Sequence, residues 1–313
     1  MENGIEDLII IGAGVAGLSA ALYGARGGLS TRIFEMGAIG GQALQIDKLE
    51  NYPGFQEPID GYQLASQLEA QAKKYGVTFC SKAVSSISKS NELFTIVAEN
   101  SEVHARSIII ATGASHRKLS ITGEDEFSGR GVSYCATCDG PFFKGKKIAV
   151  IGGGDAACDE AQFLSKLSDK VVLIHRKERF RAQKMVADRV LNNPNIRVSF
   201  NTVVKEIKGD TKVRSIVLQN LKDNSIKEEE FDGVFIFVGM EPQTHFVSQL
   251  VNLDETGYII TNQYMESSLK GIFAAGDVRN STFRQIVTAA SDGAIAAHYA
   301  GIYIDEQKNQ KYC

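Results

Sequence analysis

The pattern of apolar and small residues near the start of the chain predicts a strand, a tight turn and a helix in immediate succession. A continuous apolar run, Leu8 to Ile11, leads into Gly12, Gly14 and Gly17 and then into an Ala- and Leu-rich segment that extends to Arg26. An unbroken apolar run is typical of a strand that is buried on both faces of a parallel sheet. The segment after the glycines is long enough for a helix.

Glycines at this spacing suit the pyrophosphate of a dinucleotide. They allow a tight turn, a close approach of the backbone to the phosphates and close packing of the helix, whose N-terminus favours negative charge. The next apolar run, TRIFE, ends in Glu35, where a carboxylate can bond a ribose hydroxyl. A glycine pattern alone is weak evidence, but strand, glycines, helix, strand and acid in this order predict a dinucleotide-binding unit.

The same pattern recurs in the middle of the chain. A strand predicted over Lys147 to Ile151 leads into Gly152, Gly154 and Ala157 and then into a second helix. The two copies differ at the position of the terminal acid. Where the first copy has Glu35, the second has His175.

His175 begins a basic cluster that continues with Arg176 and Lys177 and includes Arg181. A carboxylate favours a free ribose 2′-hydroxyl, whereas a basic cluster favours a 2′-phosphate. The first unit is therefore predicted to hold an unphosphorylated adenosine and the second to hold NADP. The alternative is that the basic cluster is a solvated helix start.

Composition and charge limit the possible partners. The 313 residues suffice for about two domains, and 43% hydrophobic with 23% charged residues is ordinary for a globular protein. The net charge of -3 gives no indication of a nucleic-acid surface. The first apolar run is too short to span a bilayer and lacks the flanks of a signal peptide. We therefore expect a cytoplasmic protein that binds neither nucleic acid nor a membrane.

Among the five cysteines, only Cys135 and Cys138 are closely spaced, in the sequence CATCD. A structural zinc site normally needs two such pairs, so no metal site is expected. Cytoplasmic disulfides are usually catalytic, and CATCD is interpreted as a working dithiol. Cys80 and Cys158 are expected to be buried thiols, and Cys313 a tail residue.

Asp139 follows the second cysteine directly. Thiol–disulfide exchange needs a group that supplies and takes up protons, and Asp139 is the candidate for it. The alternative is a turn-forming aspartate before Gly140 and Pro141.

Two further apolar runs end in small-residue turns. One is IIIATGA, which contains Thr112 and Gly113, and the other is GIFAAGDV, which contains Gly276 and Asp277. Ligands of open α/β sheets bind at the carboxyl ends of the strands, which is where Asp277 is expected to lie. The segment that follows, TFRQIVTAASDGAIAAHYA, predicts a helix.

Together, these motifs closely resemble the low-molecular-weight, flavin-dependent thioredoxin reductases, a class of pyridine nucleotide-disulfide oxidoreductases, from one end of the chain to the other. The matching features are GAGVAG, Gly40-Gly41-Gln42, LENYPG with Asn51, ATG with Thr112 and Gly113, CATCD, GGGDAA with Asp155, HRKxRFR, GDV with Gly276 and Asp277, and Arg284-Gln285. The combination of CATCD with the basic cluster is what distinguishes this family from most other flavoproteins that bind two dinucleotides.

The resemblance implies an α/β fold of two Rossmann-like domains, with the NADP domain inserted into the FAD domain. The implied boundaries are 1–116 with 247–313 for FAD, and 117–246 for NADPH and the CATC motif. The implied FAD contacts are Glu35, Gly41, Gln42, Asn51, Asp277, Arg284 and Gln285. The implied NADPH phosphate contacts are Arg176, Lys177 and Arg181.

The resemblance also implies a homodimer in which electrons pass from NADPH through FAD and a Cys135–Cys138 disulfide to thioredoxin. It makes Cys138 the sulfur that faces the flavin and Cys135 the sulfur that attacks the partner. The chain departs from the family pattern at Ala156, where Ser or Thr is frequent, at Asp159, where Glu is common, and at Lys177, where Arg is usual. Lysine keeps the charge but lacks the bidentate fork of arginine, so these departures bear on NADPH affinity.

Four other classes of protein are possible, but none of them accounts for both the CATC motif and the basic cluster in this chain. A ferredoxin-type NADP reductase has no need for CATC, and a flavin-dependent dithiol oxidase has no need for the basic cluster. A non-catalytic NADPH-sensing module would not have an arranged dithiol and acid. A reductase dedicated to a peroxiredoxin is expected to carry an extra N-terminal dithiol domain, for which the sequence has no counterpart.

Overall fold

The structure is a computed structural model that describes residues 4–46, 49 and 51–308. The chain divides into two compact units. Unit 1 consists of Met1–Ser115 and Glu241–Cys313, and unit 2 is His116–Met240. The sequence placed the two joins after residues 116 and 246, and the structure has them after residues 115 and 240.

Unit 1 is built on a seven-stranded sheet with the order β3-β2-β1-β6-β5-β4, in which β17 also pairs with β6. Its strands are β1 (Ile5–Ile11), β2 (Thr31–Phe34), β3 (Thr78–Cys80), β4 (Val84–Ser90), β5 (Leu93–Ala98), β6 (Ser101–Ile110) and β17 (Ile272–Ala274). Strands β1, β2, β3, β6 and β17 are parallel, whereas β4 and β5 form an antiparallel extension. The carboxyl ends of β1, β6 and β17 therefore lie next to one another.

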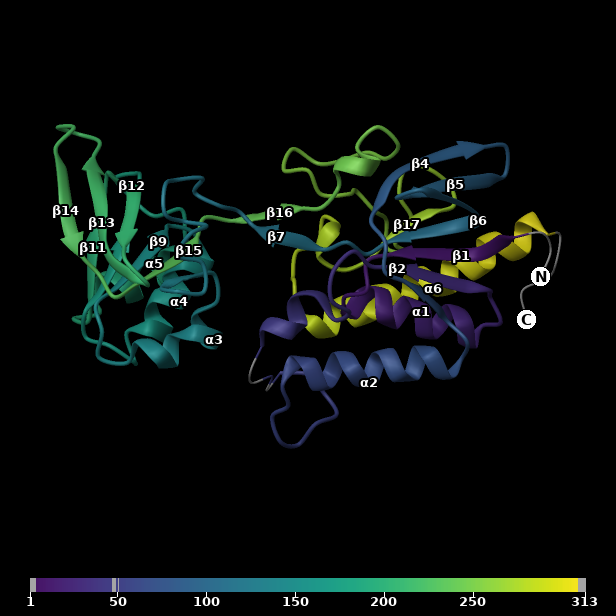
Figure 1. The fold of residues 1–313 in the computed structure, drawn as a ribbon, viewed down its shortest axis with the longest axis horizontal. Coiled ribbons are helices and arrows are strands. Elements are labelled where there is room, and N and C mark those ends of the chain that lie inside the picture. The colour runs from purple at the N-terminus through teal and green to yellow at the C-terminus, as the bar shows by residue number, and fades with distance from the viewer. Residues whose placement is uncertain (1–3, 47–48, 50, 309–313) are drawn as a thin grey trace. The chain divides into compact units, whose positions relative to one another are not determined.

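Helices cover one face of this sheet, as Figure 1 shows. They are α1 (Val15–Arg26), α2 (Gly61–Lys74) and α6 (Ile286–Gln307). Short 3-10 turns lie at Gly41–Gln45, Gly276–Val278 and His245–Val247, and the last of these packs on the other face. Successive residues of β1 alternate between two cores: Leu8 and Ile10 pack toward the helices, and Ile9 and Ile11 pack toward the other face. This alternation explains why the first apolar run has no polar position.

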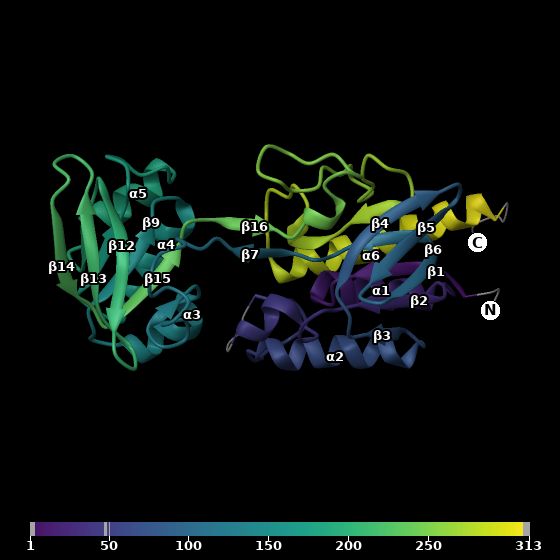
Figure 2. The same cartoon turned by 45° about the horizontal axis from the view of Figure 1, so that its top comes forward.

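Unit 2 has a five-stranded parallel sheet and a separate antiparallel sheet of three strands. The parallel sheet, in the order β11-β10-β9-β15-β8, is formed by β11 (Ile196–Ser199), β10 (Val171–Ile174), β9 (Ile148–Gly152), β15 (Gly233–Phe237) and β8 (Val132–Ser133). The antiparallel sheet is formed by β12 (Thr202–Gly209), β13 (Val213–Asn220) and β14 (Ile226–Glu230), and Figure 2 shows it most openly. The helices are α3 (Ala136–Asp139), α4 (Asp155–Leu164) and α5 (Lys184–Leu191), with a 3-10 turn at Gly140–Phe143.

The two chain crossings between the units run side by side. Strands β7 (Ala114–His116) and β16 (Met240–Pro242) pair as a small sheet of their own. On the unit 1 side the Gln243 amide donates to the Gly113 carbonyl (3.0 Å), and on the unit 2 side the Arg117 amide donates to the Gly239 carbonyl (2.9 Å). The expected fold class, one Rossmann-like unit inserted into another, is confirmed. Within the described residues, no helix combines the length and the apolar character that crossing a membrane requires.

Candidate active site

The glycine turn of unit 1 has the shape that a pyrophosphate needs. Gly12 has a positive φ of 102°, and a Cβ there would lie 2.4 Å from the Ala111 carbonyl oxygen. A Cβ on Gly17 would lie 1.9 Å from the Gly12 carbonyl oxygen, so helix α1 packs directly on the turn. At Gly14, by contrast, nothing lies within 4 Å of a Cβ position. The turn is therefore closed toward the protein and open where phosphates would approach the helix N-terminus.

Glu35 is fixed beside this turn at the end of β2. One carboxylate oxygen accepts from the Ala13 amide (2.7 Å) and the other from the Gly37 amide (2.8 Å). The Gly40 amide donates to the Ala13 carbonyl (2.8 Å), and a Cβ on Gly41 would lie 3.2 Å from the Gly14 Cα. The structure thus brings together three segments that the sequence assigned to one dinucleotide.

Other expected contacts of unit 1 are held by hydrogen bonds within the unit. Asn51 donates its amide to the Gln285 side-chain oxygen (3.0 Å), and Gln42 donates to the Ala114 carbonyl. Thr112 donates its hydroxyl to the Gln243 carbonyl (2.7 Å). The Gly113 carbonyl also accepts a bond from the Gln243 backbone amide (3.0 Å).

Asp277 and Arg284 form the charged part of the site. The pKa of Asp277 is raised, mainly because its carboxyl group is buried. The positive charge of Arg284 opposes this shift, and the negative charge of Asp292 adds to it. The Arg284 guanidinium carbon lies 4.1 Å from the centre of the Tyr258 ring, and the buried Arg284 Nε has no hydrogen-bond partner. A buried donor without a partner is costly, so this nitrogen fits a ligand that supplies the missing acceptor.

The second glycine turn, in unit 2, repeats the first. Gly152 has a φ of 158°, and a Cβ there would lie 2.4 Å from both the Phe237 carbonyl oxygen and the Ala157 Cβ. Ala157 is fully buried, which explains why a small residue is needed there. At Gly154, as at Gly14, nothing lies within 4 Å of a Cβ position. This turn is therefore closed and open at the same positions as the first.

His175 differs from the other members of the expected basic cluster. It is only 5% exposed, and its ring packs against Phe180 and Phe200 beneath Gly153. Burial lowers the pKa of His175, so the ring is held neutral near pH 7. His175 therefore supports the glycine turn from below and adds no positive charge to it.

Arg176, Lys177 and Arg181 are exposed, and they lie on a loop between β10 and α5 rather than at a helix start. The Arg181 amide donates to the Gly153 carbonyl (2.7 Å), which fixes the loop to the glycine turn. A second hydrogen bond holds the same loop: the Gln183 amide donates to the Asp155 carboxylate (2.7 Å). The backbone of the basic loop is thus held at the glycine turn by two hydrogen bonds.

Cys135 is partly buried and disulfide-bonded. Its amide donates to the Ser133 hydroxyl (3.1 Å), and its Sγ lies 3.4 Å from the Thr137 Oγ1. Cys138 belongs to helix α3, but its side chain lies outside what the structure describes. The pairing of Cys135 with Cys138 therefore stays a prediction.

Two other cysteines are free thiols. Cys158 is buried as expected, and burial raises its pKa to about 11. Cys80 is only partly buried, which corrects the expectation of a fully buried thiol, because β3 is at the edge of its sheet. Cys313 lies outside the described residues.

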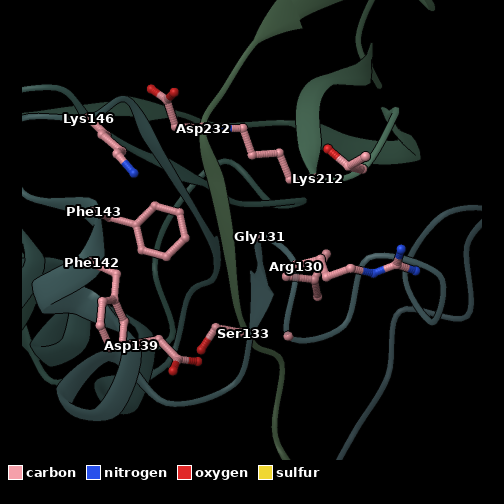
Figure 3. Close-up of a pocket in the computed structure, with 12 residues that line it drawn as sticks. Arg130, Gly131, Ser133, Asp139, Phe142, Phe143, Lys146, Lys212 and Asp232 are labelled. Carbon is pink, nitrogen blue, oxygen red and sulfur yellow. The ribbon is translucent and has the colours of Figure 1, made fainter.

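Asp139 ends helix α3 and borders a pocket of about 430 Å³ within unit 2. Its side chain forms no capping bond to the turn that follows, so the structure gives no support to a purely turn-forming role. Figure 3 shows Asp139, Phe142 and Phe143 on one side of this pocket, with Lys146 next to Phe143 and Lys212 on the opposite side. Phe142 is 71% exposed, which is unusual for a residue of its size and apolar character.

Comparison with known proteins agrees with this geometry. The family model described as "Pyridine nucleotide-disulphide oxidoreductase" matches residues 6–293. Among curated relatives, the thioredoxin reductase of Treponema pallidum is 52% identical over 303 residues, which are 97% of this chain and 98% of that one. The thioredoxin reductase of Bacillus subtilis is 43% identical over 306 residues, 97% of this chain and 96% of the relative.

Solved structures show the same likeness. The crystal structure of Lactococcus lactis thioredoxin reductase has 44% sequence identity and a TM-score of 0.80, covering 96% of this chain and 99% of its own. That of the Streptococcus pyogenes thioredoxin reductase has 42% identity and a TM-score of 0.78, covering 97% and 100%. The likeness includes both units and the crossings between them. The chain therefore belongs to the pyridine nucleotide-disulphide oxidoreductases and, within them, to the thioredoxin reductases.

Proposed function

We propose that the chain is an NADPH-dependent thioredoxin-disulfide reductase that uses FAD. The observation that carries the proposal is the disulfide-bonded Cys135 in the same unit as an open glycine turn and a basic loop. Either nucleotide turn alone would suit many oxidoreductases. The disulfide is an acceptor within the chain for the two electrons that NADPH donates.

The residues of unit 1 fit FAD. Gly12, Gly14 and Gly17 would hold the pyrophosphate, Glu35 the ribose, and Asp277 with Arg284 would lie at the carboxyl end of the sheet. The buried and unpartnered Arg284 Nε supports this assignment. FAD, when bound, supplies the chemistry that converts hydride transfer from NADPH into reduction of a disulfide.

The residues of unit 2 fit NADPH. The turn at Gly152 and Gly154 would hold the pyrophosphate, and Arg176, Lys177 and Arg181 the 2′-phosphate. Asp155 fastens the loop that carries these cations by accepting the Gln183 amide. Because the hydrogen bonds from the loop to the turn are already formed in the structure, little ordering is needed when the nucleotide binds.

Cys135 and Cys138 would carry out the exchange. Two electrons and two protons convert their disulfide into two thiols. The Cys135 thiolate then attacks the partner's disulfide to form a mixed disulfide, and Cys138 displaces the partner as a dithiol, which restores the starting bond. Asp139 supplies and takes up the protons of these steps.

The partner would dock where unit 2 offers exposed apolar surface close in sequence to the dithiol. Phe142 and the pocket beside Asp139 meet this condition. An exposed aromatic residue at the rim of a pocket is typical of an anchor for another protein. A thioredoxin-like protein, which presents its own disulfide, is the occupant that the family relationship favours.

Purified protein reconstituted with FAD should oxidise NADPH only slowly when alone and rapidly when oxidised thioredoxin is added together with a disulfide reagent. If the protein binds flavin and oxidises NADPH but thioredoxin does not increase the rate of that oxidation, the proposal is contradicted. We further propose that the enzyme is a homodimer of the cytoplasm, as its family and composition favour. Sedimentation at micromolar concentration tests the dimer.

A further inference from the structure

The residue that directly precedes Cys135 is fixed at two points. The Tyr134 hydroxyl donates a hydrogen bond of 2.8 Å to the Glu124 carboxylate. The Tyr134 ring stacks on the His116 ring, with 5.6 Å between centroids and 24° between planes. All of these residues belong to unit 2. A hydrogen bond at one end and a stacked face at the other leave the ring little freedom to turn.

Glu124 is an unusual anchor because it is a carboxylate with only 1% exposure. Besides the Tyr134 hydroxyl, it accepts the amides of Leu119 (2.9 Å) and Ser120 (2.7 Å). Within residues 4–46 and 51–308, no salt bridge reaches Glu124, and the nearby Lys118, whose charge interacts with it, is paired with Asp125 (2.6 Å). A buried carboxylate is tolerated only when its oxygens are hydrogen-bonded, so the Tyr134 hydroxyl is one of three donors on which this charge depends.

The backbone around Glu124 is shaped for this role. Ser120 has a φ of 58°, in the left-handed region that few residues other than glycine adopt. This conformation accompanies two successive amides that donate to the same carboxylate. Burial and the bond to Glu124 raise the pKa of Tyr134, so its hydroxyl stays protonated and remains a donor at working pH.

The contacts of Tyr134 therefore connect the start of unit 2 to the redox segment. His116 ends β7, the first crossing strand, and the loop that bears Leu119, Ser120 and Glu124 follows it directly. Ser133, two residues before Cys135, makes a second attachment: its hydroxyl accepts the Cys135 amide and donates to the Cys135 carbonyl. The backbone entering Cys135 is thus fixed through the two residues that precede it.

We infer that Tyr134, anchored by the buried Glu124, is a positioning residue that holds Cys135 in place for disulfide formation. The inference rests on the proposed function, because it takes Cys135 and Cys138 as the redox couple. Fixing Cys135 raises the effective concentration of its sulfur next to the second sulfur. The disulfide form, in which the structure shows Cys135, is then favoured over the dithiol.

The test is the midpoint potential of the couple in full-length, FAD-loaded protein. Tyr134→Phe removes the hydroxyl and keeps a ring that can stack on His116. We expect a potential less negative by about 30 mV, which is a tenfold change in the equilibrium constant of a two-electron couple. Glu124→Gln should shift the potential in the same direction, because an amide presents one acceptor oxygen where the carboxylate presents two. Redox buffers of dithiothreitol, followed by alkylation and mass measurement of the thiols, give the potential.

A matched control removes a tyrosine hydroxyl elsewhere. Tyr303 in unit 1 accepts a bond from Gln307 (2.6 Å), and Tyr303→Phe should leave the potential of the couple unchanged. A wild-type potential in Tyr134→Phe, or equal shifts in both tyrosine variants, would overturn the positioning role while leaving the proposed function intact. A wild-type protein whose Cys135 disulfide is not reduced by NADPH at all would overturn both.

Discussion

Gly153 and Gly154 are adjacent residues with opposite environments. Substitutions at these two positions can therefore distinguish an effect on folding from an effect on ligand binding. A Cβ on Gly153 would lie 2.1 Å from the buried His175 ring, whereas a Cβ on Gly154 meets nothing within 4 Å. The first glycine is therefore required by packing inside unit 2. The second is required only if a ligand approaches from outside.

We predict that Gly153→Ala destabilises the protein by about 1–3 kcal/mol, the usual cost of overpacking. Gly154→Ala should keep the wild-type melting temperature and weaken NADPH binding, because its methyl group would occupy the approach of the pyrophosphate. Thermal unfolding and a fluorescence titration with NADPH separate the two effects. If Gly154→Ala bound NADPH as tightly as wild type, the pyrophosphate would not lie over this turn.

The two cysteines of CATCD should also be separable. Cys135→Ser should abolish thioredoxin reduction, because one sulfur cannot form the disulfide, while NADPH should still bleach the flavin absorption. The remaining Cys138 thiolate should produce a long-wavelength absorption band next to oxidised flavin, and Cys138→Ser should not. Cys80→Ala, which removes a free thiol of unit 1, is the control and should stay active. Full thioredoxin reduction by Cys135→Ser would contradict the dithiol assignment.

At the scale of elements, the basic loop between β10 and α5 makes a prediction about nucleotide choice. Arg176→Ala combined with Arg181→Ala should weaken the use of NADPH much more than that of NADH. Each charge-assisted bond to the 2′-phosphate contributes about 1.5–3 kcal/mol, or roughly ten- to a hundredfold. The ratio of kcat/KM for the two nucleotides measures the effect.

Arg189→Ala is the matched control, because it removes a charge from the last turn of α5 instead of from the loop. It should leave the ratio unchanged. Equal losses with NADPH and NADH in the double variant would mean that the loop is merely a solvated surface.

The elements that the sequence predicted best are those whose signal is local. Each strand–glycine–helix unit has an apolar run and a turn in fixed order, so β1 with α1 and β9 with α4 were placed correctly within a few residues. The antiparallel strands β12, β13 and β14 were not predicted, because their exposed faces mix charged and apolar residues. Local patterns do not encode which distant segments pair.

The same limit applies within the candidate site. The glycines and the basic cluster were recognised from spacing, but the neutral, buried state of His175 depends on Phe180 and Phe200, which fold over it. The bond from Gln183 to Asp155 and the anchor of Tyr134 on Glu124 had no signal in the sequence. Both depend on how loops close, which spacing does not specify.

At the scale of the whole molecule, unit 2 is one continuous stretch with its own sheets and two apolar cores. We predict that residues 116–240, produced alone, fold cooperatively and bind NADPH but no flavin. Circular dichroism on heating and a titration with NADPH test this. A product without a cooperative transition would mean that unit 2 needs unit 1 for its stability.

Unit 1, by contrast, is assembled from both ends of the chain. Its sheet is extended by β17 at β6, and α1 lies against α6 so closely that a Cβ on Gly293 would be 2.1 Å from the Ala16 carbonyl oxygen. Both β17 and α6 belong to the second segment of unit 1. The face of α1 that packs against α6 therefore has no cover until that segment exists.

This arrangement sets an order of events during synthesis on the ribosome. All of unit 2 is translated before β17 and α6. At about 5–20 residues per second, the segment Glu241–Cys313 takes roughly 4–15 s to make. During that interval the nascent chain carries a fully translated unit 2 and an α1 helix whose α6-facing apolar surface is uncovered, the kind of surface that chaperones bind. The domain that starts first is therefore the last to be completed.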